Sequence, residues 1–231
     1  MPRKVVHIDE PAIAAIKEGL PEVLPANGAV IDLLSSWRSH WPEGFPKQRL
    51  VGLGLNAEEM ADNPDLDEYV VHNVNTTPQL PFAADAFDAV VLTVSIQYIT
   101  QPIAVFQEVG RILRPGGPFV VIFSNRMFPT KAVAIWRMLD DQKHIDLVAA
   151  YFHHAGNFVE IAAHNWSPGF LPPLYQGTVL RPQEPRILNL DLPPDLKGDV
   201  QRQNLDLLAE LRHVAPAGRV SCCRMPASTI A

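Results

Sequence analysis

Short apolar runs alternate with helical patterns along the first 180 residues, and this alternation constrains the fold more than any other feature. The spacing predicts strands at 29–33, 50–55, 69–71, 87–94 and 119–123, and a last pair at 158–163 and 175–180. Helices are predicted over 9–19, from 56 onward, and over 103–113, 130–139 and 145–155. Strands separated by helices form parallel sheets that helices cover on both faces, so the chain is predicted to be an α/β protein.

Local signals mark where several of these helices begin and end. Asp9 can cap the first helix, which Pro21 is expected to interrupt. Asn56 can cap the second helix, with Glu59 at the capping-box position three residues later. Arg114-Pro-Gly-Gly117 is expected to end the helix over 103–113.

Beyond Pro168 the chain becomes rich in proline, which favours extended, irregular structure. We therefore expect one domain over residues 1–182 and an appendage over 183–231 that is partly disordered. One amphipathic helix is possible in the appendage, at about 200–211, and it could contact a partner.

Charge and composition exclude several classes of function. Nineteen Lys and Arg against 25 Asp and Glu give a net charge of −6, and no basic run is present, so nucleic acid is not expected as a partner. No apolar stretch approaches the roughly 20 residues of a membrane span, and no signal peptide is evident, so we expect a cytoplasmic protein. The adjacent Cys222 and Cys223 lack partners at metal-ligand spacing, so no metal site is expected.

Polar and aromatic side chains gather where the predicted strands end. In open parallel sheets ligands bind outside the carboxyl ends of the strands, so a binding cleft is expected there. The residues at these ends are Ser35, Ser36, Trp37, Arg38, His40, Asn56, His72, Asn73, Asn75, Ser95, Gln97, Tyr98, Ser124, Asn125 and Arg126.

Four motifs in order resemble those of class I S-adenosylmethionine-dependent methyltransferases. They are Val30-Ile-Asp-Leu33, Gly52-Leu-Gly-Leu-Asn56, Leu80-Pro-Phe-Ala-Ala-Asp-Ala-Phe-Asp88 and Phe106-Gln-Glu-Val-Gly-Arg-Ile-Leu-Arg-Pro-Gly-Gly117. The resemblance runs from about Asp9 to Leu180. A little-characterised methyltransferase-like branch is more similar still, through Ser35-Ser-Trp-Arg-Ser-His40, Phe123-Ser-Asn-Arg-Met-Phe-Pro-Thr-Lys131 and Tyr151-Phe-His-His-Ala-Gly156.

The resemblance implies a Rossmann-like, doubly wound, mostly parallel seven-stranded sheet with an antiparallel last strand. It also implies S-adenosylmethionine as cofactor and methyl transfer to an unidentified small molecule. The implied cofactor-binding residues are Asp32, Ser35, Ser36, Trp37, Gly54, Asn56, Asn73, Val74 and Ser95. The implied acceptor-binding residues are Gln97, Tyr98, Asn125, Arg126 and His153, with His40 as the candidate base.

Three positions depart from the family pattern, and the first two together leave an alternative open. Leu34, Ser36 and Arg38 stand in the loop where the family has glycines, and side chains in positive-φ conformations cost of order 1 to 3 kcal/mol. Gly54 replaces the acid for the ribose hydroxyls, a loss of roughly ten- to a hundredfold in affinity. Asn73 replaces an aspartate facing the adenine amine. The alternative is therefore a catalytically degenerate binding or scaffold protein, which a Trp37 side chain filling the pocket would favour.

Several single residues have two interpretations each. Trp37 either faces a ligand in the cleft or packs in the core, and His40 either accepts a proton or anchors the loop. Asn56 either contacts the ribose or only caps its helix. Arg126 either binds an acidic substrate or pairs with Asp85 or Asp88.

Overall fold

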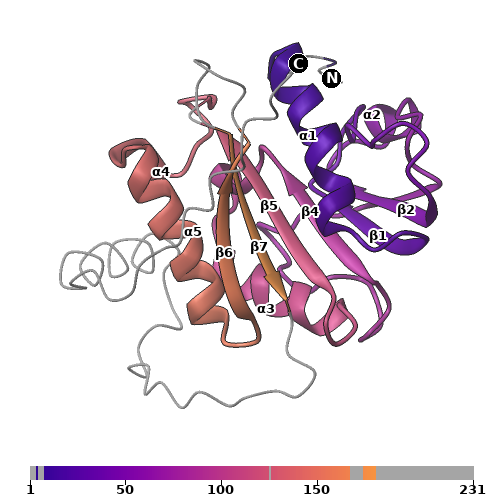
Figure 1. Cartoon of the computed structure of the whole chain (residues 1–231). Helices are drawn as coiled ribbons and strands as arrows, with labels where there is room; N and C mark the ends of the chain where they lie inside the picture. The colour runs from indigo at the N-terminus through magenta and orange to yellow at the C-terminus, as the bar shows by residue number, and fades with distance from the viewer. Residues whose placement is uncertain (1–3, 5–7, 125, 167–173, 181–231) are drawn as a thin grey trace, which may run out of the picture.

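The computed structural model describes residues 4, 8–124, 126–166 and 174–180. In this part of the chain the strands form one sheet in the order β3-β2-β1-β4-β5-β7-β6 (Figure 1). The strands are β1 Gly28–Leu33, β2 Lys47–Gly54, β3 Glu68–Val71, β4 Ala89–Thr93, β5 Pro118–Ser124, β6 Val159–Asn165 and β7 Leu174–Leu180. Pairing is parallel from β3 to β5, whereas β7 runs antiparallel to both β5 and β6. The predicted α/β fold with a mostly parallel sheet is confirmed.

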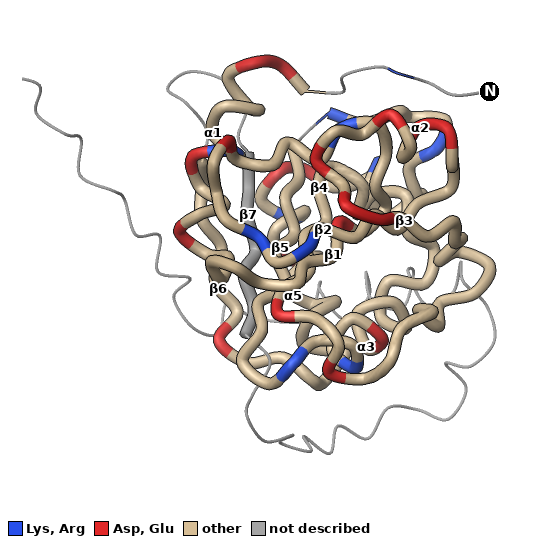
Figure 2. Tube along the Cα trace, turned by 90° about the vertical axis from the view of Figure 1, so that its right-hand side faces the viewer, with Lys and Arg blue, Asp and Glu red and all other residues tan. Residues whose placement is uncertain are grey.

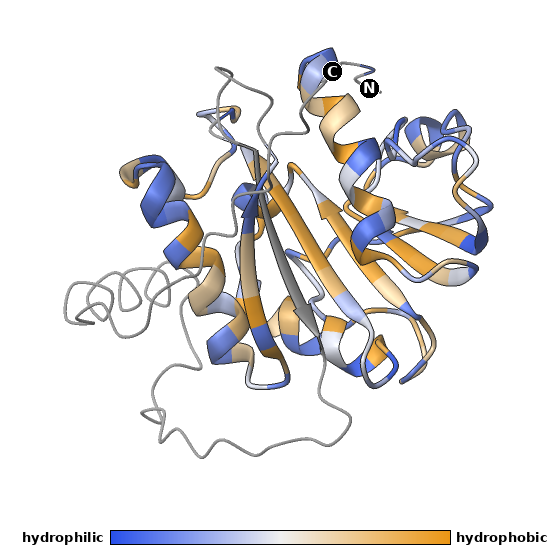
Figure 3. Ribbon diagram, in the orientation of Figure 1, coloured by the Kyte–Doolittle hydropathy of each residue, from blue (hydrophilic) through white to orange (hydrophobic). Residues whose placement is uncertain are grey.

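The central strands are the most apolar and the most deeply buried. Figure 3 shows the apolar colouring of the central strands. Every residue of β1 and of β5 is buried, whereas the edge strand β3 leaves Tyr69 and Val71 exposed. β1 pairs with β2 on one side and with β4 on the other, so the chain changes direction across the sheet between β3 and β4. Ligands bind at such a switch point, beyond the carboxyl ends of the strands.

Helices cover both faces of the sheet, because alternate residues of each buried strand point to opposite faces. On one face Ile31 and Leu33 pack in a core cluster with side chains of α3 (Pro102–Ile112), α4 (Ala134–Met138) and α5 (Asp141–Ala155). On the other face Val30 packs in a second cluster against α1 (Glu10–Val23). The short α2 (Ala57–Ala61) follows β2, and the 3-10 helix η1 (Ile96–Tyr98) follows β4.

The predicted helix boundaries are correct where a cap defines them. Asp9 caps α1 by accepting a hydrogen bond from the Ala12 amide, as predicted. The helix nevertheless continues through Pro21 to Val23, because a proline in the last turn removes a single hydrogen-bond donor and the Leu24 amide still bonds to the Leu20 carbonyl.

Two further helix predictions are corrected in their extent. The helix predicted over 130–139 shortens to α4, since Val133 is extended. The helix predicted from 145 begins at Asp141, because Asp140 caps it through the Lys143 amide. The proposed appendage over 183–231, with its possible helix at 200–211, lies outside the described residues.

Within the described residues, no helix is long and apolar enough to cross a membrane.

Candidate active site at the carboxyl ends of the strands

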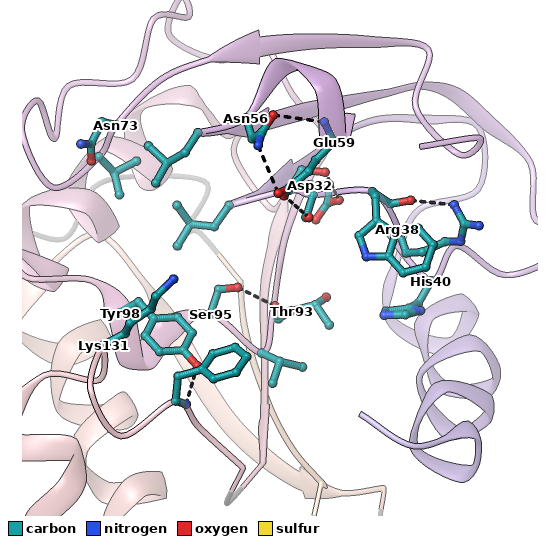
Figure 4. A pocket seen from close by; sticks show the side chains of 18 of the residues that line it. Asp32, Arg38, His40, Asn56, Glu59, Asn73, Thr93, Ser95, Tyr98 and Lys131 are labelled. Carbon is teal, nitrogen blue, oxygen red and sulfur yellow. Dashed lines mark hydrogen bonds between the residues drawn. The ribbon is translucent and has the colours of Figure 1, made fainter. Parts of the chain in front are cut away.

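A cavity of about 590 Å³ opens at the carboxyl ends of β1, β2 and β4, where the switch point lies (Figure 4). It is lined by Ile8, Asp32, Leu34, Ser35, Ser36, Trp37, Arg38, His40, Leu55, Asn56, Glu59, Asn73, Val74, Asn75, Thr93, Val94, Ser95, Tyr98, Phe128 and Lys131. The volume lies within the usual range of small-molecule sites. The cleft expected from the strand ends is therefore present.

Asp32 anchors the loop that follows β1. Its carboxylate is 5% exposed and accepts hydrogen bonds from Ser35 Oγ at 2.6 Å and Ser39 Oγ at 2.5 Å. The side-chain amide of Asn63 donates hydrogen bonds to Ser39 Oγ and to the Ser36 carbonyl, both at 2.9 Å. Burial raises the pKa of Asp32 to about 6, although the two serine hydroxyls oppose this shift. The loop is thus held by a buried carboxylate and its donors.

Left-handed backbone conformations occur at three non-glycine residues around the cavity. Leu34 has φ 60°, His40 has φ 55° and Val94 has φ 50°. Such conformations cost of order 1 to 3 kcal/mol each, and the cost is greatest for a β-branched residue such as valine. The loop after β1 therefore keeps a conformation that glycine would adopt more easily, and the hydrogen bonds to Asp32 help to hold it.

Gly54 is required by the path of this loop. A side chain at position 54 would overlap the Ser35 carbonyl oxygen and lie 3.0 Å from Met60 Sδ. The Ser35 amide also donates to the Leu53 carbonyl at 2.9 Å, which fixes the loop backbone over the end of β2. The path of the loop after β1 and the absence of an acid at position 54 are therefore coupled. The loop backbone occupies the space that a side chain at position 54 would need.

Glu59 brings a carboxylate to the cavity from the first turn of α2. Its Oε1 accepts from Asn56 Nδ2 at 3.1 Å, and its Oε2 accepts from Ser36 Oγ at 2.7 Å. Asn56 also caps α2 through the Glu58 and Glu59 amides, as predicted. Glu59 was predicted only as a capping-box residue, although a capping-box acid at the end of a central strand was a signal for the site.

These hydrogen bonds form one connected set, which we call the strand-end network. Its members are Asp32, Ser35, Ser36, Ser39, Asn56, Glu59 and Asn63.

A second set, which we call the aromatic wall, consists of Tyr98, Phe128 and Lys131. The two rings stack with centroids 6.5 Å apart and planes 29° apart, and the Tyr98 hydroxyl accepts from the Phe128 amide at 3.0 Å. Lys131 Nζ lies 5.9 Å from the centroid of the Phe128 ring. Asn75 supports the wall by donating to the Tyr98 carbonyl at 2.9 Å. Tyr98 was predicted, whereas Phe128 and Lys131 were missed because they lie in the irregular segment after β5.

Trp37 lines the cavity and leaves it open. The Arg38 guanidinium lies 4.2 Å from the Trp37 ring centroid and donates to the Trp37 carbonyl at 2.8 Å. His40 lies on the same side of the cavity as Arg38 (Figure 4). A tryptophan filling the pocket would have favoured the scaffold interpretation, and the structure does not show one.

Three other predicted cofactor residues also line the cavity. They are Asn73, Val74 and Ser95. Asn73 Oδ1 accepts from the Asn75 amide at 3.0 Å, and Ser95 Oγ donates to the Thr93 carbonyl at 2.9 Å. The second lone pair of the Asn73 amide oxygen is still able to accept from an adenine amine.

The structure does not bring four of the predicted residues to the cavity. Gln97 is completely buried and donates to the Val94 carbonyl at 3.1 Å, so it braces the end of β4. Arg126 pairs with Asp9 at 2.8 Å rather than with a cavity group, Asp85 or Asp88. His153 is exposed on α5, and Gly54 lies under the loop backbone.

The remaining acceptor residue, Asn125, lies outside the described residues. Among the described residues no cluster of His, Cys, Asp and Glu could hold a metal ion.

Two family models match separate parts of the chain. Residues 46–121 match a family model described as a methyltransferase domain. Residues 126–221 match a second model, described as a protein of unknown function (DUF1501). A relative from Teredinibacter turnerae, the biotin biosynthesis bifunctional protein BioHC, is 26% identical over 109 residues. That match covers 46% of this chain but 19% of the relative.

Solved structures share the fold at low sequence identity. An S-adenosylmethionine-dependent methyltransferase from Mesorhizobium loti has a TM-score of 0.54 at 17% identity, covering 73% of this chain and 98% of its own. A Listeria monocytogenes structure assigned to the same class has a TM-score of 0.55 at 13% identity, with coverage of 75% and 99%. The [4+2]-cyclase SpnF has a TM-score of 0.53 at 13% identity, with coverage of 73% and 81%, so the fold also occurs in a cyclase.

The methyltransferase-domain match, the relative and the shared fold agree with the motifs in the sequence. Residues 46–121 match a methyltransferase domain, and the chain has the fold of S-adenosylmethionine-dependent methyltransferases.

Proposed function

We propose that this protein transfers a methyl group from S-adenosylmethionine to a small-molecule acceptor. The observation that carries the proposal is the open cavity of about 590 Å³ between the ends of β1 and β4, with Trp37 on its wall. A catalytically degenerate scaffold protein has no need to keep this space open. The acceptor is a small molecule rather than a nucleic acid because the chain carries a net charge of −6 without a basic run.

The residues around the cavity fit this cofactor. Glu59 and Asn56 would hold the ribose hydroxyls, which takes over the part of the acid that position 54 lacks. Asn73 and Val74 would hold the adenine. Thr93 lines the cavity, and its buried Oγ1 has no hydrogen-bond partner among the described residues.

The other end of the cofactor would lie along the loop after β1. The Arg38 guanidinium is suited to a carboxylate, and the Trp37 ring is suited to a sulfonium, which as a cation is attracted to a ring face. Ser35 and Ser36 were predicted to bind the cofactor. In the structure their hydroxyls donate to Asp32 and Glu59, so their part is to hold the loop.

S-adenosylmethionine, when bound, supplies a methyl group on a positively charged sulfur. The residues of the chain orient the acceptor and exclude water, which is most of what such a transfer requires. His40 lines the cavity and would take the proton from an acceptor that must lose one, because an imidazole can accept a proton near neutral pH.

The degenerate alternative depended on two losses, the glycines and the ribose acid. The loop backbone occupies the space that a side chain at position 54 would need, so the missing acid is not a sign of decay independent of the altered loop. Calorimetric titration of the purified full chain with S-adenosylmethionine and S-adenosylhomocysteine tests the proposal. Saturable binding of both is expected, and no detectable binding of either at millimolar concentration would overturn it.

The assignment of Glu59 is tested by Glu59→Gln. We expect the affinity for S-adenosylhomocysteine to fall about tenfold, because a charge-assisted hydrogen bond is worth roughly 1.5 to 3 kcal/mol. The matched control is Glu58→Gln, since Glu58 is an exposed neighbour on the same helix that does not line the cavity.

A ligand lacking the ribose 2′-hydroxyl separates contact from structural support. Wild type should bind S-adenosylhomocysteine more tightly than its 2′-deoxy analogue, and Glu59→Gln should reduce this preference. Equal losses of affinity for both ligands would show that Glu59 acts through the fold and does not contact the ribose.

A further inference from the structure

The aromatic wall brings an apolar surface of two aromatic rings to the cavity. Its rings come from separate segments, Tyr98 from η1 and Phe128 from the segment after β5, yet they stack with planes 29° apart. Phe128 is 38% exposed, which is high for a phenylalanine beside a site. Planar conjugated groups are the ligands that stack well on such a surface.

The two cations that line the cavity contact aromatic rings. Basic and acidic residues are interspersed over the described chain (Figure 2), and many form ion pairs such as Lys47–Asp67, Arg49–Glu68 and Arg114–Asp88. Lys131 and Arg38 instead lie over Phe128 and Trp37. Among the described residues neither has an ion pair with Asp or Glu, so the Lys131 ammonium has no neutralising carboxylate there.

The carboxylates of the cavity are held on the opposite part of its lining. Asp32 accepts hydrogen bonds from two serine hydroxyls. Glu59 accepts hydrogen bonds from a serine hydroxyl and from the side-chain amide of Asn56. Figure 4 shows Tyr98 and Lys131 together on one side of the cavity, away from Asp32 and Glu59 and across from Arg38 and His40. The positive charge of Lys131 is therefore available to a ligand that lies on the aromatic wall.

We propose that the acceptor is a planar aromatic carboxylate whose ring stacks on Tyr98 and Phe128 and whose carboxylate pairs with Lys131. This inference rests on the proposed function in one respect, which is that the ligand on the aromatic wall is the methyl acceptor. The carboxylate is the anchor, and a hydroxyl elsewhere on the ring is the nucleophile. The hydroxyl oxygen forms a bond to the methyl carbon, its proton passes to a base, and the carbon–sulfur bond breaks with its electron pair kept by sulfur.

Three probes of similar shape test this binding site. They are 4-hydroxybenzoate, its neutral analogue 4-hydroxybenzamide, and the non-aromatic 4-hydroxycyclohexanecarboxylate. Each is titrated into the full chain with and without saturating S-adenosylhomocysteine. We expect the benzoate to bind at least about tenfold more tightly than the amide, and several-fold more tightly than the cyclohexane acid, under both conditions.

Variants identify the groups responsible. Lys131→Gln should lower the affinity for the benzoate to that for the amide, without changing the affinity for the amide or for S-adenosylhomocysteine. Phe128→Leu should remove the preference for the aromatic ring over the cyclohexane ring. The control is Lys143→Gln, because Lys143 lies on α5, pairs with Asp140 and is outside the cavity.

The outcomes separate the two proposals. If S-adenosylhomocysteine binds but benzoate and amide bind equally, the substrate class is wrong and the proposed function stands. If S-adenosylhomocysteine does not bind, the proposed function fails, and the titrations without it still decide whether Lys131 selects a ring carboxylate. Competition between benzoate and S-adenosylhomocysteine would place the anion in the cofactor's part of the cavity and overturn the inference.

Discussion

The two sides of the cavity are built from different interactions. In the strand-end network, side-chain hydrogen bonds of 2.5 to 3.1 Å join Asp32, Glu59 and their donors into one connected set. In the aromatic wall, ring contacts are joined by one hydrogen bond, from the Phe128 amide to Tyr98 Oη. Hydrogen bonds between buried groups are directional and costly to break, whereas ring contacts tolerate small displacements.

This difference teaches how one cavity serves two ligands. The network side is suited to a cofactor that is always the same molecule, because its shape is fixed before binding. The wall side is suited to an acceptor, because a flat surface with one cation selects a class of molecule rather than a single one.

The largest effect on the strand-end network is expected from Gly54→Asp, which places an acid at the position where the methyltransferase family has one. We expect a loss of about 1 to 3 kcal/mol in the free energy of unfolding and a loss of S-adenosylhomocysteine binding by more than about tenfold. The reason is that the new Cβ would overlap the Ser35 carbonyl and displace the loop. Urea unfolding and calorimetric titration measure the two effects.

Gly54→Ala is the control that separates steric overlap from charge. It should destabilise the protein nearly as much as the aspartate does. If Gly54→Asp instead binds the ligand more tightly than wild type, the loop is free to move and the account of Gly54 given above is wrong.

A smaller effect is expected from Asp32→Asn, seen in the dependence of stability on pH. The folded protein raises the pKa of Asp32 from 3.8 to about 6, so its neutral form favours folding at low pH. This contribution is complete below about pH 3.8 and is lost as the pH rises through about 6. Between pH 5 and 7.5 the loss amounts to roughly 1 kcal/mol in the free energy of unfolding.

The asparagine does not titrate, so the variant should lack this loss while its amide oxygen still accepts from the serines. Urea unfolding of both proteins at pH 5 and pH 7.5 measures the difference. Identical pH dependence in the two proteins would mean that Asp32 titrates normally in the fold.

The smallest effect should come from the wall side, through Tyr98→Phe. Removing the hydroxyl leaves the Phe128 amide without its acceptor, at a cost of about 0.5 to 1 kcal/mol in stability. The affinity for S-adenosylhomocysteine should change less than about twofold, because the network side is untouched. A tenfold loss of this affinity, as expected for Glu59→Gln, would show that a change in the aromatic wall also disturbs the strand-end network.

The sequence predicted the elements of the fold well because their signals are local. Apolar runs placed the strands within a few residues, and Asp9 and Asn56 were recognised as helix caps from their immediate neighbours. Pro21 was misjudged, since a proline in the last turn of a helix interrupts less than one in its middle.

The site was predicted in outline, and the errors share one cause. Gln97 and Arg126 follow the ends of central strands, yet one turns into the core and the other pairs with Asp9, more than a hundred residues earlier in the chain. Phe128 and Lys131 lie in the motif that runs from Phe123 to Lys131, but the motif gave neither residue a role, and their segment has no periodicity. Which way a side chain points after a strand depends on backbone angles and on neighbours that are distant in sequence.

The sequence by itself determined the order of strands and helices, the edge of the sheet that carries the cleft, and the family resemblance. These follow from hydrophobic spacing and from motifs, which are properties of short segments. Only the tertiary structure decided that the loop after β1 excludes a side chain at Gly54, that Glu59 reaches the cavity, and that Lys131 lies beside two stacked rings. Each of these is a contact between separate segments, and folding alone brings such segments together.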